Sequence, residues 1–117
     1  MAVEEMEQLS PLDLLIRLYE GAINFLKQSA DDCKAERMDS FKENLRRGRR
    51  IIEEFQRTLD FKQGGQITAQ LNDLYTYMLD SLRQFELTHD ELHIERVIDQ
   101  LETLLEGWRG AQYQAVA

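Results

Sequence analysis

The sequence predicts an all-α protein, an antiparallel four-helix bundle with up-down-up-down topology. Four stretches repeat apolar residues at alternating three- and four-residue steps, short polar or glycine-containing connections separate them, and no strand pattern competes. The 117 residues, 43% of them hydrophobic, suffice for one domain with a substantial core. We expect a short N-terminal segment at residues 1–9, the bundle at residues 10–110 and a frayed tail at residues 111–117.

The first helix is predicted over residues 10–32. Ser10 can accept a hydrogen bond from an exposed amide, Pro11 suits the first helical position, and Asp13 complements the positive helix end. The helix carries a core stripe and a second apolar stripe, which together cover roughly 220° of its circumference. The core stripe is Leu12, Leu15, Ile16, Tyr19, Ile23 and Leu26, and the second stripe is Leu14, Leu18, Gly21 and Phe25. Either the other helices of the bundle pack on this helix from two sides, or part of the arc is a groove for a partner's apolar helix.

The other three helices each show one apolar face. The second is predicted over residues 39–59 after a polar connection at residues 31–37, and the third begins after Gly64 and Gly65. A capping box of Thr88 and Glu91 is expected to start the fourth, whose end Gly110 weakens. The core positions are Phe41, Leu45, Gly48, Ile52, Phe55 and Leu59, then Ile67, Leu71, Leu74, Met78, Leu82 and Phe85, then Ile94, Val97, Ile98, Leu101, Leu104, Leu105 and Trp108.

Three residues of the third helix stand at the margin of its apolar face. Tyr75 and Leu79 lie at one edge of the core stripe, and Tyr77 lies at the other. Tyrosine suits a surface that is sometimes covered, because its hydroxyl tolerates water, although tyrosines at a core edge are also ordinary. The candidate partner-binding residues are Leu14, Leu18, Phe25, Tyr75, Tyr77 and Leu79.

The net charge of −8 argues against general binding to nucleic acid or to anionic membranes. We see no signal peptide and no stretch long enough to span a membrane, so the sequence predicts a cytoplasmic protein. The second helix nevertheless contains one basic run, which is Lys42, Arg46, Arg47, Arg49 and Arg50. This run is either a solvated face of ion pairs with neighbouring glutamates or a contact for an acidic partner.

No arrangement of residues predicts an enzyme, a cofactor or a metal centre. His89 and His93 stand four apart and Glu86 precedes them, but no dependable third ligand accompanies these side chains. Their neighbours also differ from those of a phosphotransfer histidine, so only the bundle architecture is shared with that class. Cys33 has no histidine-containing nucleophile arrangement around it in the sequence.

Several segments resemble the flagellin-specific secretion chaperone family (FliS). The opening helix carries Ser10-Pro11, Asp13-Leu14 and then Leu18-Tyr19-Glu20-Gly21-Ala22, similar to the family's opening pattern. The matching segments further along are Ile51-Ile52-Glu53-Glu54-Phe55, Thr58-Leu59-Asp60, Gly64-Gly65-Gln66-Ile67, Leu71, Leu74-Tyr75-Thr76-Tyr77-Met78, Leu82 and Trp108. The resemblance covers residues 10–110 and implies an antiparallel four-helix bundle.

The resemblance also implies a function. It implies a chaperone that binds the disordered C-terminal segment of flagellin, prevents premature polymerisation and docks as a complex on the export gate. Some family members also bind an anti-sigma factor, and a regulatory adaptor role is the alternative. The N-terminal segment departs from the family, since residues 1–9 contain no Tyr, and Gln8-Leu9 precede Ser10. If that segment covers the groove poorly, we expect some self-association into a homodimer.

Overall fold

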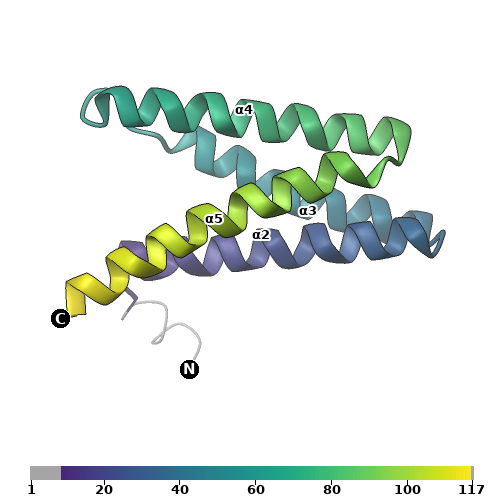
Figure 1. The fold of residues 1–117 in the computed structure, drawn as a ribbon, viewed down its shortest axis with the longest axis horizontal. Helices are drawn as coiled ribbons and strands as arrows, with labels where there is room; N and C mark the ends of the chain where they lie inside the picture. Colours follow the sequence, from purple (N-terminus) through teal and green to yellow (C-terminus); the bar gives the residue numbers. More distant parts are fainter. Residues whose placement is uncertain (1–8, 117) are drawn as a thin grey trace.

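The computed structural model describes residues 9–116, which form four helices in the predicted order. They are α2 (Pro11–Lys34), α3 (Met38–Arg57), α4 (Gly65–Thr88) and α5 (Glu91–Val116). Each helix packs on its neighbour in the chain, and α5 also packs on α2, so the antiparallel four-helix bundle is confirmed. Figure 1 shows that α5 runs obliquely across the bundle, from the end of α4 to the N-terminal part of α2.

The start of α2 is fixed by the predicted cap. The Asp13 amide donates to Ser10 Oγ at 3.0 Å, and the Ser10 amide donates to Asp13 Oδ2 at 3.2 Å. Pro11 occupies the first helical position, where a missing amide hydrogen is harmless. The two reciprocal bonds satisfy amides that the helix itself leaves free, and they set the position from which the apolar stripes of α2 begin.

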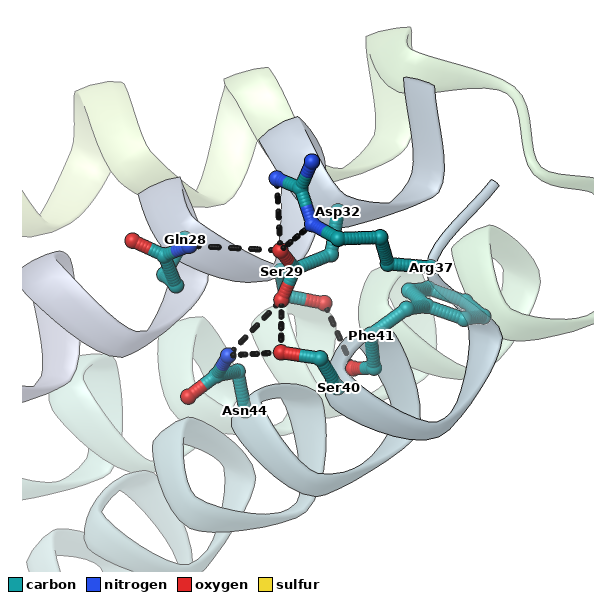
Figure 2. Close-up of polar contacts among 7 residues, drawn as sticks. All are labelled: Gln28, Ser29, Asp32, Arg37, Ser40, Phe41 and Asn44. Atoms are coloured by element: carbon teal, nitrogen blue, oxygen red, sulfur yellow. Dashed lines mark hydrogen bonds and ion pairs between the residues drawn. The ribbon is translucent and has the colours of Figure 1, made fainter. Parts of the chain in front are cut away.

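The end of α2 differs from the prediction. The connection expected at residues 31–37 is shorter, because α2 continues to Lys34 and contains Asp32 as a fully buried residue. Figure 2 shows donors from α2, from α3 and from the turn between them converging on this carboxylate. Oδ1 accepts from Gln28 at 3.2 Å and Arg37 at 2.9 Å, while Oδ2 accepts from Ser40 and Asn44.

This cluster around Asp32 ties the end of α2 to the start of α3. The donors, first among them the Ser40 hydroxyl, outweigh burial and lower the pKa of Asp32 from its ordinary 3.8 to about 2. A second bond runs from Ser29 Oγ to the carbonyl oxygen of Phe41 at 3.0 Å. The α2–α3 turn is thus held by a charged, fully bonded core rather than by a flexible loop.

The start of α5 corrects the sequence analysis. Thr88 is the last residue of α4, and Asp90 caps α5 instead, because its Oδ1 accepts from the Leu92 amide at 3.0 Å. His89, between them, adopts a left-handed conformation with φ of 60°. At its other end the helix continues past Gly110 to Val116. This end of α5 is tied to α2 by the ion pair of Arg109 with Glu20 at 2.7 Å and by the hydrogen bond that Gln112 donates to Asp13.

Four aromatic rings, one from each helix, fill the centre of the bundle. Tyr19 stacks on Phe55 with ring centroids 4.5 Å apart and meets Trp108 edge-on at 6.2 Å. Phe55 also contacts the ring of Tyr75 at 5.7 Å. The hydroxyls of Tyr19 and Tyr75 hydrogen-bond to each other at 2.5 Å, and both residues are buried. Each hydroxyl is therefore satisfied by the other inside an apolar core.

Candidate functional site

A groove of about 610 Å³ runs along the outer side of the contact between α2 and α3. Its lining is Leu15, Leu18 and Phe25 from α2 with Arg46, Arg47, Arg50, Ile51, Glu54, Phe55 and Thr58 from α3. Leu18 is 38% exposed, and Leu14, one turn earlier on the same helix, is 43% exposed. Large aliphatic side chains normally lie buried, so adjacent exposed leucines along a hollow indicate a surface for another apolar group.

Beside the groove, α2 and α3 approach each other closely. Gly48 makes this approach possible, because a Cβ atom there would lie 2.5 Å from Leu26 Cδ2. Ile51 and Phe55 follow Gly48 on α3 and form the apolar floor with Leu15. Gly21, on the second stripe of α2, is less constrained, since a Cβ there would meet only Ile51 Cδ1 at an ordinary 3.8 Å.

Arginines form the α3 edge of the groove. Arg46 and Arg47 both bond to Glu43, at 2.7 and 2.9 Å, and these contacts, with Arg46 first, lower the pKa of Glu43 to about 2. The guanidinium of Arg47 also lies over the ring of Phe25, 5.7 Å from its centroid. Three members of the basic run, Arg46, Arg47 and Arg49, form ion pairs, and the run borders the apolar hollow through Arg46, Arg47 and Arg50.

The six candidate partner-binding residues do not all lie at the same place in the structure. Phe25 and Leu18 line the groove with Leu14 beside them, so the second stripe of α2 faces α3. The residues of α4 lie elsewhere, because α4 packs on α3 and α5 and contributes nothing to the groove lining. Tyr77 is 43% exposed on α4, whereas Leu79 is partly buried against the core.

Tyr75 corrects the sequence analysis, because it lies in the core rather than at its edge. It is 3% exposed, and its hydroxyl is bonded to Tyr19. The sequence analysis also missed the apolar contribution of α3, since Ile51 lines the groove without having been a candidate. Ile51 falls beside the core stripe of its helix, and this position was the available signal.

The histidines and the cysteine lie at the opposite end of α2 from the Ser10 cap. His89 packs edge-on against Phe41 with centroids 5.2 Å apart, and Cys33 shares with it a hollow of about 370 Å³. Burial, and then the nearby Glu91, raise the pKa of Cys33, which keeps its thiol protonated. Within residues 9–116, no three His, Cys, Asp or Glu side chains are grouped so that they could hold a metal ion.

Comparison with known proteins places this architecture in a family. The profile of the family described as Flagellar protein FliS matches residues 2–115. The chain belongs to the FliS family. Three relatives carry the name Flagellar secretion chaperone FliS. The Campylobacter jejuni protein is 32% identical over 100 residues, which are 86% of this chain and 78% of that protein. The Salmonella typhimurium protein is 31% identical over 86% of this chain and 75% of its own length, and the Bacillus subtilis protein is 26% identical over 87% and 75%.

The resemblance noted from the sequence motifs is thereby confirmed. The FliS family comprises flagellar secretion chaperones, so the groove between α2 and α3 belongs to a protein of an export-chaperone family. No helix within residues 9–116 combines the length and apolar character needed to cross a membrane.

Proposed function

We propose that this protein is a cytoplasmic export chaperone for flagellin. It binds the disordered C-terminal segment of flagellin, prevents premature polymerisation and delivers the segment to the export gate of the flagellar type III apparatus. Family membership supports the class of function, and the apolar groove between α2 and α3 is the observation that supports client binding. The bound segment forms an amphipathic helix whose apolar face covers Leu14 and Leu18.

Exposed apolar surface in the groove favours the binding of a client. Leu14 and Leu18 are each about two-fifths exposed, at 43% and 38%, so each retains part of the free energy available from burial. Covering the remainder stabilises a complex by about 1 kcal/mol per leucine, since complete burial is worth roughly 1.5–3 kcal/mol. A disordered segment loses conformational entropy when it folds in the groove, so it needs several such contacts along its length.

The test is calorimetric titration of the full-length protein with the C-terminal segment of flagellin from the same organism. We expect a one-to-one complex with a large negative heat-capacity change, because a disordered segment folds while apolar surface is buried. Leu18→Glu places a charge in the groove and should weaken binding at least tenfold. Leu87→Glu is the matched control, because Leu87 is 67% exposed on α4 and does not line the groove. Circular dichroism of both variants separates loss of binding from loss of folding.

Two outcomes contradict the proposal in different ways. No heat with the flagellin segment refutes flagellin as the client and favours the adaptor alternative, which co-purification with a regulator such as an anti-sigma factor supports. Equal loss of affinity in Leu18→Glu and Leu87→Glu, with both proteins folded, refutes the assignment of the client to the α2–α3 groove.

A further inference from the structure

The two edges of the α2–α3 groove differ in charge. The α2 residues that line it are all apolar, whereas α3 contributes three arginines and one glutamate. The charged residues that line the groove or bond to its lining are Arg46, Arg47, Arg50, Arg57, Glu43 and Glu54, so positive charge exceeds negative charge by two. This local excess contrasts with a net charge of −8 for the chain.

The glutamates at this edge leave the arginines incompletely paired. Glu43 is shared by two guanidinium groups, those of Arg46 and Arg47. Glu54 bonds to Arg57 at 2.6 Å. Among residues 9–116, no carboxylate lies within 4.0 Å of the Arg50 guanidinium. Arg50 thus borders an apolar hollow with its hydrogen-bond donors available to a bound molecule.

Arg47 is held beside the apolar part of the groove. Its guanidinium lies over the ring of Phe25, and Phe25 itself lines the hollow. When an apolar helix fills the groove it excludes water from this region, and the lower dielectric strengthens an ion pair formed at its edge. A carboxylate on the client can then bond to Arg47 and Arg50 while the apolar face of the same helix contacts Leu18.

We propose that the groove selects an amphipathic helix that carries carboxylates along the flank facing α3, where Arg47 and Arg50 bind them. This inference rests on the proposed function, since it specifies the chemistry of the client segment. Because the opposite edge is apolar, the acidic flank fits on one side only, so the pairing fixes how the client helix is rotated in the groove.

The test uses two designed amphipathic peptides with the same apolar face. One carries glutamates along one flank, and the other carries glutamines at those positions. Titrated into the full-length protein at low salt, the glutamate peptide should bind about fivefold more tightly, as expected for roughly 1 kcal/mol of ion pairing. The preference should shrink in 1 M salt, which screens charges beyond about 3 Å.

Arg50→Gln should abolish most of the preference, measured as the ratio of the affinities for the two peptides. Arg96→Gln is the control of equal charge change, because Arg96 is exposed on α5 and does not line the groove. The control matters because the overall negative charge repels the glutamate peptide from the whole protein. Only a local contact makes Arg50→Gln differ from Arg96→Gln.

Equal affinities for the two peptides in the unmodified protein, or equal effects of the two arginine variants, would overturn the inference. Failure of both peptides to bind would overturn it too, since the groove then accepts no amphipathic helix. If the peptides are discriminated but the flagellin segment does not bind, the inference stands and flagellin is excluded as the client.

Discussion

Removing the Tyr75 hydroxyl should destabilise the bundle without weakening client binding. The hydroxyls of Tyr19 and Tyr75 are bonded at 2.5 Å inside the core, and the residues are 0% and 3% exposed. Burial raises the pKa of both phenols, so both hydroxyls stay protonated at all physiological pH values. In Tyr75→Phe, the Tyr19 hydroxyl remains buried and loses this partner.

The loss of this hydrogen-bond partner sets the expected change in the free energy of unfolding. An unsatisfied buried hydroxyl costs about 1–3 kcal/mol, whereas removing both members of a pair can be nearly neutral. Tyr75→Phe and Tyr19→Phe should therefore each lower the free energy of unfolding by about 1–2 kcal/mol. The double variant should lose clearly less than the sum, with a coupling energy of about 1 kcal/mol. The rings remain, so stacking of Tyr19 on Phe55 is kept.

Urea denaturation followed by circular dichroism measures the three free energies, and calorimetry measures client binding by the same proteins. Additive losses would refute the hydroxyl pair as the source of the stability. Weaker client binding by fully folded Tyr75→Phe would contradict the buried position and restore Tyr75 as a contact residue.

Three further predictions concern the packing, the charged cluster and self-association. Gly48→Ala should lower the free energy of unfolding by about 1–2 kcal/mol, because the new Cβ atom forces Leu26 to move. Gly107→Ala should raise the free energy of unfolding by about 0.5–1 kcal/mol, because a Cβ atom there meets no atom within 4 Å. Urea denaturation measures both values. The lowered pKa of Asp32 contributes stability that is fully present above about pH 4 and is lost as the pH falls towards 2. Asp32→Asn should therefore be less stable than the unmodified protein at neutral pH, and urea denaturation at decreasing pH should show this difference shrink. Self-association through the groove should give dimers in light scattering at high concentration and monomers for Leu18→Glu; a clean monomer of the unmodified protein contradicts it.

The sequence predicted those features that depend on helical periodicity and local capping. The second apolar stripe of α2 lies on the side facing α3, where Leu18 and Phe25 line the groove. The Ser10 and Asp13 cap was predictable because all its atoms come from one turn. Such features are encoded within a few residues, so the wide apolar arc could be interpreted without tertiary information.

The features that the sequence analysis missed depend on contacts between helices. Asp32 stands in a polar stretch that is typical of a loop, and only its donors on α3 make it a core residue. The burial of Tyr75 depends on its hydroxyl partner on α2, and a helical wheel of α4 alone places it at an edge. Gly110 does not end α5, because Gln112 bonds to Asp13 of α2 in the following turn.

The two flanks of α2 differ in the residues that they present. Towards α5 the helix is closed by charged pairs, with Lys27, Lys34 and Glu20 each facing an opposite charge on α5. Towards α3 the pairs are replaced by Leu14, Leu18 and Phe25, and the hollow remains open along them. The Ser10 cap fixes one end of this open flank, and the Asp32 cluster fixes the other. The α2 side of the groove is therefore held at both ends, so we expect a client that binds there to become ordered while α2 keeps its position.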